Sequence, residues 1–121
     1  MIWHIIQSDT NTAQNRRSEE IFMKFIQMVE KNFRNERRVT WYAEQLSITP
    51  KYLSEVIRQI SRETPSKWID DFVTLELRVL LKNSNLSIKE IAERMHFPNQ
   101  SFLGKFFKEH VGMSPKEYRK A

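Results

Sequence analysis

The sequence predicts an all-α fold built from two helix–turn–helix units, and three observations support this prediction. Apolar residues recur at helical spacing along the chain, and no stretch alternates as a half-buried strand requires. A hydroxyl residue followed by proline, which is typical of a helix start, occurs at Thr49-Pro50, Thr64-Pro65 and Ser114-Pro115. Finally, one short pattern occurs twice, in residues 39–68 and 88–118.

The first predicted helix covers residues 18–33. Apolar residues from Ile21 to Phe33 recur at helical spacing and give one apolar face, and Ser18 is the expected N-cap. The polar residues 8–15 before it are typical of a linker. The apolar stretch at the start of the chain resembles the end of a helix, so we expect residues 1–17 to be a linker and the remnant of a preceding domain.

Six further helices are expected at residues 40–46, 50–61, 65–82, 88–95, 100–110 and 115–120. Ser87 with Glu90 and Ser114 with Glu117 have the spacing of capping boxes, and Gly112 is placed to end the sixth helix. Helix 65–82 is apolar on nearly all sides, so we expect it to be buried from more than one direction and to pack against both repeats.

The two repeats share a helix–turn–helix pattern. Ala92 follows Ala43 by 49 residues and Pro115 follows Pro65 by 50, so the second copy has one extra residue in its turn. In this motif the second helix enters the major groove of DNA. The expected organisation is a domain over residues 18–121, with a first unit at 39–64, a connecting helix at 65–82 and a second unit at 86–120.

Composition restricts the function classes. The net charge of +5 suits a polyanionic partner, although a solvated basic face has the same charge. The chain has no cysteine and only two glycines, which excludes thiolate metal sites and phosphate-cradling glycine loops. Its three histidines lack zinc-site spacing and no activated nucleophile motif is present, so we expect no enzyme activity, no cofactor and no metal. No apolar run reaches the ~20 residues that span a bilayer.

Residues 46–54 and 86–119 carry a resemblance to a known family. The runs Leu46-Ser47-Ile48-Thr49-Pro50 and Gly112-Met113-Ser114-Pro115-Lys116 are similar to those of the AraC/XylS family of bacterial transcription regulators. The similarity extends over about residues 18–120. It implies an all-α DNA-binding domain with two units joined by a long helix.

The candidate site residues lie on the second helix of each unit, on the flank that its core-facing residues leave open. The family's base-contacting positions fall on the same flank. Candidates for base readout are Lys51, Ser54, Glu55, Gln100, Ser101, Gly104 and Lys105, and candidates for phosphate contacts are Arg58 and Lys108. Lysine can donate to guanine, glutamine can pair with adenine and glutamate can accept from cytosine.

Several of these residues have a second interpretation. Glu55 can pair with Arg58 or Gln59 within its helix instead of accepting from a base. Glycine in a helix costs about 1 kcal/mol relative to alanine, which suggests a reason for Gly104. This glycine is either a substitution without function that the helix tolerates, or a point where the backbone comes close to DNA. Asn99 can serve only as an N-cap, and Tyr52 and Phe102 can pack at the protein edge instead of contacting thymine methyl groups.

One residue departs from the family pattern. Arg62 stands where family members often have glycine, as Gly112 does in the second unit. A glycine there accepts a left-handed backbone, which arginine resists. We therefore expect either a different end of helix 50–61 or strain at Arg62.

The leading prediction is sequence-specific binding of double-stranded DNA by two recognition helices in successive major-groove segments, in order to regulate transcription. The alternative is a helical protein-interaction module that binds DNA weakly. The resemblance also implies a bacterial, cytoplasmic regulator, with activation among its roles and RNA polymerase among its partners. It implies an effector-sensing or dimerisation domain outside this chain.

Overall fold

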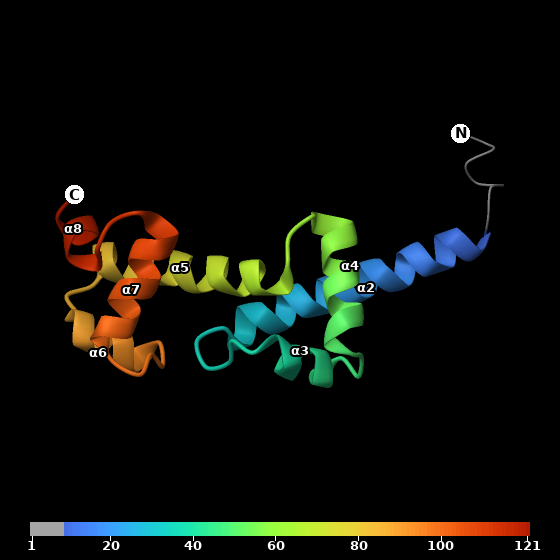
Figure 1. The fold of residues 1–121 in the computed structure, drawn as a ribbon, viewed down its shortest axis with the longest axis horizontal. Helices are drawn as coiled ribbons and strands as arrows, with labels where there is room; N and C mark the ends of the chain where they lie inside the picture. The colour runs from blue at the N-terminus through green and yellow to red at the C-terminus, as the bar shows by residue number, and fades with distance from the viewer. Residues whose placement is uncertain (1–8) are drawn as a thin grey trace. The chain divides into compact units, whose positions relative to one another are not determined.

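The computed structural model describes residues 9–121, and every regular element in that range is an α-helix, as predicted (Figure 1). The helices are α2 (Asp9–Asn32), α3 (Val39–Gln45), α4 (Pro50–Ser61), α5 (Pro65–Asn83), α6 (Ile88–Arg94), α7 (Gln100–Val111) and α8 (Pro115–Lys120). The six helices after α2 begin and end within one residue of the expected bounds.

The start of α2 differs from the prediction. The helix begins at Asp9, so Ser18 is an interior residue with its side chain buried, and it is not an N-cap. Residues 12–17 are all exposed, and a helical segment that is polar on every side has no apolar periodicity to reveal it. The expected helix remnant at Met1–Gln7 lies outside the described residues.

The other predicted N-caps are confirmed. The hydroxyls of Thr49 and Thr64 accept from the backbone N–H groups of Tyr52 and Lys67, each at 3.1 Å. Asn99 caps α7 by accepting from the Phe102 N–H at 2.9 Å. Both capping boxes are complete, at Ser87–Glu90 on α6 and Ser114–Glu117 on α8. These side chains satisfy N–H groups that have no partner within their own helix.

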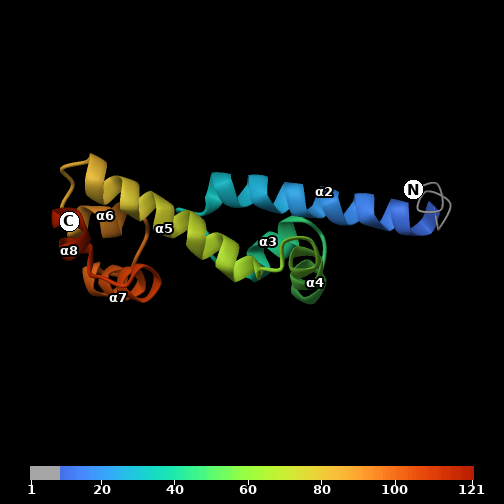
Figure 2. The ribbon, with the colours of Figure 1, turned by 90° about the horizontal axis from the view of Figure 1, so that it is seen from above.

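The helices form two compact units. Among the described residues, unit 1 comprises residues 9–30 and 38–68, and unit 2 comprises residues 31–37 and 69–121. In unit 1 the buried ring of Tyr42 on α3 contacts Phe25 of α2, with ring centroids 5.7 Å apart. In unit 2 the buried Phe107 of α7 contacts Tyr118 of α8 at 5.3 Å, and Figure 2 shows α6, α7 and α8 gathered beside α5.

Helix α5 divides between the units, because its first turn belongs to unit 1 and the part from Ile69 onward to unit 2. The helix is apolar on nearly all sides, but it is not buried on all of them. Its buried apolar residues Ile69, Val73, Leu77 and Leu81 follow one another at intervals of four, and Thr74 beside Val73 is also buried. Leu75 and Val79 are 61% and 43% exposed.

The turn between the two helices of each unit has the same backbone geometry. The N–H of Ile48 donates to the Ala43 carbonyl and the N–H of Phe97 to the Ala92 carbonyl, both six-residue closures of a Schellman motif. The residue before each donor adopts a left-handed backbone, with φ of 56° at Ser47 and 58° at His96. Beyond this shared turn, Pro98 is the extra residue of the second unit, since Thr49 follows Ile48 directly whereas Asn99 follows Pro98.

Arg62 ends α4 in the left-handed conformation, with φ of 64°, as Gly112 ends α7 with φ of 95°. The end of the helix is therefore like that of the second unit, and the strain expected at Arg62 is present. An L-residue in this region pays about 1–2 kcal/mol that glycine does not.

We expect Arg62→Gly to raise the free energy of unfolding by about 1 kcal/mol, because glycine removes the steric cost but loses more entropy on folding. Urea denaturation of the two proteins measures the change. The reciprocal variant Gly112→Ala should be destabilised, since it places a Cβ at positive φ. An unchanged or lowered stability of Arg62→Gly would show that Arg62 stabilises the turn through its side chain.

Candidate nucleic-acid interface

Each unit holds its second helix by a narrow buried face. Leu53, Val56 and Ile57 anchor α4, whereas Leu103 and Phe107 anchor α7. Because these residues recur at intervals of three and four, they occupy one side of each helix and leave the opposite side to solvent. The N-terminal end of each helix is fixed by its capping residue, Thr49 or Asn99.

The candidate residues of α4 lie on its open side. Lys51, Glu55 and Arg58 are exposed and Ser54 is half-buried. No ion pair joins Glu55 to Arg58 among the residues that the structure describes. The intrahelical pair considered for Glu55 is therefore not formed in this structure.

The candidate residues of α7 also share an open side. Gln100, Ser101, Lys105 and Lys108 are exposed, and Gly104 is half-buried. A Cβ built onto Gly104 meets no heavy atom of the described chain within 4 Å. Protein packing therefore does not require glycine at this position. The Asn99 side-chain oxygen, by contrast, is engaged in its cap.

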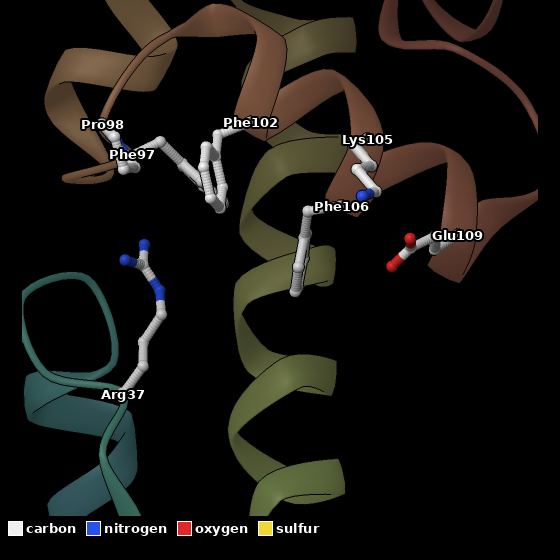
Figure 3. Close-up of a pocket in the computed structure, with 7 residues that line it drawn as sticks. All are labelled: Arg37, Phe97, Pro98, Phe102, Lys105, Phe106 and Glu109. Carbon is white, nitrogen blue, oxygen red and sulfur yellow. The ribbon is translucent and has the colours of Figure 1, made fainter.

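An apolar cleft of about 490 Å³ lies beside α7 within unit 2 (Figure 3). Its lining residues are Arg37, Phe97, Pro98, Phe102, Lys105, Phe106 and Glu109. Phe102 is 59% exposed and lies at the cleft, one turn before Lys105. Tyr52, the other aromatic residue considered for contact with thymine methyl groups, is half-buried on α4.

The glutamates of the two capping boxes accept hydrogen bonds from the backbone of their own N-cap residues. The pKa of Glu90 lies below its usual value because its carboxylate accepts a hydrogen bond from the Ser87 backbone N–H. The pKa of Glu117 is lowered in the same way by the Ser114 N–H. Both carboxylates therefore stay ionised at neutral pH and reduce the positive charge of unit 2.

Two features of the site were missed by the sequence reasoning. The left-handed residues Ser47 and His96 are not glycines, so composition did not mark them. Arg37 lies beside the α6–α7 turn of unit 2 although it is 58 residues before Met95, whose carbonyl accepts from its guanidinium. No local pattern in a single sequence signals a contact of that separation.

The described residues contain no group of three or more histidine, aspartate or glutamate side chains placed to hold a metal ion. Among the helices from Asp9 onward, none is long and apolar enough to cross a membrane.

Comparison with known proteins gives the family. Residues 42–121 match the family model described as Helix-turn-helix domain. The C-terminal domain of AraT, a response regulator from Geobacillus stearothermophilus, is 30% identical with a TM-score of 0.78, and the match covers 83% of this chain and 84% of that one. The DNA-binding domain of AdpA, solved in complex with a target DNA, is similar in fold, with 21% identity, a TM-score of 0.73 and coverage of 82% and 89%.

Full-length regulators are also similar. The transcriptional activator RhaS of Escherichia coli O139:H28 is 26% identical over 91 residues, which cover 75% of this chain and 33% of RhaS. The chain thus spans about a third of the length of that relative. The predicted resemblance is confirmed, and the chain belongs to the helix–turn–helix domain family, in its AraC-type branch.

Proposed function

We propose that this chain binds double-stranded DNA sequence-specifically through α4 and α7, and that it regulates transcription as part of a longer protein. The proposal is supported by AdpA, whose similar domain was solved with its target DNA, and by RhaS, a transcriptional activator. The alternative, a protein-interaction module with weak DNA binding, has no comparable support among these relatives.

The observation that carries the proposal is the open flank on the second helix of each unit. Exposed lysine, glutamine and glutamate side chains stand there on helices whose ends are capped and whose opposite faces are buried. An α-helix fits the major groove, where these side chain types can distinguish base pairs. Because both helices are already formed in the free protein, DNA binding does not require the conformational entropy cost of ordering their backbone.

We assign two roles to the flank residues. Lys51, Ser54 and Glu55 on α4, with Gln100, Ser101, Gly104 and Lys105 on α7, face base edges. Arg58 and Lys108 lie one turn further along their helices and contact phosphates, which supply affinity with little sequence information.

Two recognition helices in one chain favour an asymmetric DNA site. The units differ in sequence at every candidate position, so each reads a different half of the site. If the two recognition helices occupy successive major-groove segments on one face of DNA, they must lie about 34 Å apart, which is one helical turn of the duplex. A site that departs from this spacing must be bent, at a cost of about 1–6 kcal/mol.

Selection from a pool of random DNA duplexes tests the proposal. The expected result is one enriched, nonpalindromic motif whose affinity falls steeply as salt rises. The absence of any enriched motif together with salt-independent binding would instead support the protein-interaction module.

We further propose that an effector-sensing or dimerisation domain belongs to the full protein, because the chain spans 33% of RhaS and 41% of another Escherichia coli regulator. Contact with RNA polymerase, a cytoplasmic location and the lack of catalysis, cofactor and metal are parts of the same proposal. They accord with the transcription regulators to which the chain is similar.

Gly104 provides a separate test of close approach to DNA. Gly104→Ala should raise the free energy of unfolding by about 1 kcal/mol, because alanine is the better helix former and its Cβ meets open space. The same methyl group should weaken binding to the selected site by about 1–3 kcal/mol through overpacking against DNA.

Thermal or urea unfolding and a binding titration on the same preparation measure both quantities. We expect the two effects to be opposite: the variant should be more stable than the parent protein but should bind DNA more weakly. A more stable protein with unchanged DNA affinity would mean that the glycine has no role at the DNA surface.

A further inference from the structure

The connector between α2 and α3, residues 33–38, makes contacts that its sequence does not reveal. Its residues up to Arg37 belong to unit 2. Phe33 contacts Phe72 of α5 with ring centroids 5.7 Å apart, and the Arg34 guanidinium donates to the Glu76 carboxylate at 2.7 Å. The aromatic contact fixes this part of the connector to α5 within unit 2, because an ion pair as exposed as Arg34–Glu76 contributes little to stability.

From this anchored position, the connector reaches the turn between α6 and α7. The guanidinium of Arg37 donates to the backbone carbonyl of Met95 and, at 3.4 Å, to that of His96. The His96 ring meets the Arg34 carbonyl at 3.0 Å, and because a carbonyl only accepts, Nδ1 is the donor. Three hydrogen bonds thus connect the connector with the C-cap of α6 and the left-handed residue after it.

The two carbonyls are natural targets for an arginine. The Met95 carbonyl, at the C-cap of α6, has no partner in its own helix and lies at the negative end of the helix dipole, and the His96 carbonyl follows it in the turn. A guanidinium presents several N–H donors in a rigid plane, so one side chain can serve both carbonyls. Among the described residues, no side chain serves the equivalent carbonyls of Leu46 and Ser47 in unit 1.

The contacts continue to the recognition helix. The Arg37 guanidinium lies over the Phe97 ring, 4.6 Å from its centroid, and the Phe97 ring contacts Phe106 of α7 at 5.5 Å. Figure 3 shows Arg37 pointing from the connector toward Phe97 and Pro98. The turn that Arg37 holds is the longer of the two, because it contains the extra residue Pro98.

We propose that Arg37 is a positioning residue for DNA readout by the second unit: it fixes the α6–α7 turn and through it the orientation of α7. The inference rests on the proposed function of α7. Arg37 itself does not contact DNA, and its effect is confined to the base pairs that α7 reads.

The first test uses the full chain with Arg37→Met, which keeps an aliphatic stem and removes every donor. On the selected site, discrimination against substitutions in the α7 half should fall by about tenfold, whereas discrimination in the α4 half stays as in the parent protein. The slope of log affinity against log salt should not change, because no phosphate contact is lost. Arg37→Lys should recover little, since an ammonium lacks the planar fork.

Arg34→Met is the matched control. It removes one positive charge and the exposed Arg34–Glu76 ion pair from the same connector, but it leaves the Phe33–Phe72 contact, the Arg37 donors and the Arg34 carbonyl in place. Its discrimination in the α7 half should equal that of the parent protein. Unchanged discrimination with Arg37→Met would overturn the inference, and so would full recovery with Arg37→Lys. A shallower salt slope would also overturn it, because Arg37 would then be a phosphate contact.

Amide hydrogen exchange without DNA separates this inference from the proposed function. The N–H groups of His96 and Phe97 close the turn, and their protection should fall about tenfold in Arg37→Met but not in Arg34→Met. If the parent chain selected no DNA motif, the proposed function would fail. The exchange experiment would still decide whether Arg37 holds the turn, because it is done without DNA. Unchanged protection would refute the structural role.

Discussion

Truncation of Phe107 to alanine is expected to lower the free energy of unfolding by about 3–5 kcal/mol, the range for loss of a buried phenylalanine. Phe107 is completely buried on α7 and contacts Tyr118 of α8 in an edge-to-face arrangement. The loss combines the removed apolar surface with the cavity that a close-packed core cannot fully close. Domains of this size have about 5–15 kcal/mol of total stability, so most of it can be lost.

Phe102→Ala is the matched control, because it makes the same change on the same helix. Its ring is 59% exposed, so we expect stability to change by no more than about 0.5 kcal/mol. Urea denaturation of the three proteins measures the difference. Equal losses in the two variants would mean that α7 is not anchored by the face that contains Leu103 and Phe107.

The second large effect concerns base readout. Gln100→Ala and Lys105→Ala should each lower discrimination at particular base pairs by about 1–3 kcal/mol. The reason is that each substitution leaves donors or acceptors on one base edge without a partner. Both residues are exposed on α7, so folding stability should change little.

Arg58→Ala and Lys108→Ala should behave differently. Loss of a phosphate contact weakens binding to all sequences about equally and reduces the salt slope by about one. Titration of cognate and scrambled duplexes at several salt concentrations separates the two classes. If all four variants lost affinity equally on both duplexes, the division into base and phosphate contacts would be wrong.

Local signals in the sequence were sufficient for most of the fold. Hydroxyl–proline pairs fix helix starts because the hydroxyl accepts from a backbone N–H and proline needs no partner, and the caps at Thr49, Thr64 and Ser114 follow this rule. The buried faces of α4 and α7 followed from apolar spacing alone. The family resemblance was confirmed on these same segments.

The remaining features depend on tertiary contacts or on the lack of apolar residues. The first turns of α2 are polar on all sides, so periodicity could not place the start at Asp9. The apolar composition of α5 predicted burial from more than one direction, but composition does not tell which apolar side chains stay exposed, as Leu75 and Val79 do. Arg37 and the α6–α7 turn are almost 60 residues apart, a separation at which a single sequence carries no pairing information.

The two units are unequal in ways that bear on function. The first ends its recognition helix at a strained Arg62, whereas the second uses Gly112. Only the second unit has Pro98 in its turn and an arginine on the turn carbonyls. We therefore expect the α7 half of the DNA site to be read more stringently than the α4 half, because the turn before α7 is held by additional hydrogen bonds from the connector.

The central claim is that a single chain reads one asymmetric DNA site with two unequal helices. It is tested most directly by titrating the protein with the selected duplex and with two versions of that duplex, each with one half scrambled. We predict a complex of one chain per intact duplex, weaker binding when either half is scrambled, and the larger loss when the α7 half is scrambled. Two chains on a palindromic motif, or no loss on scrambling one of the halves, would contradict this mode of binding.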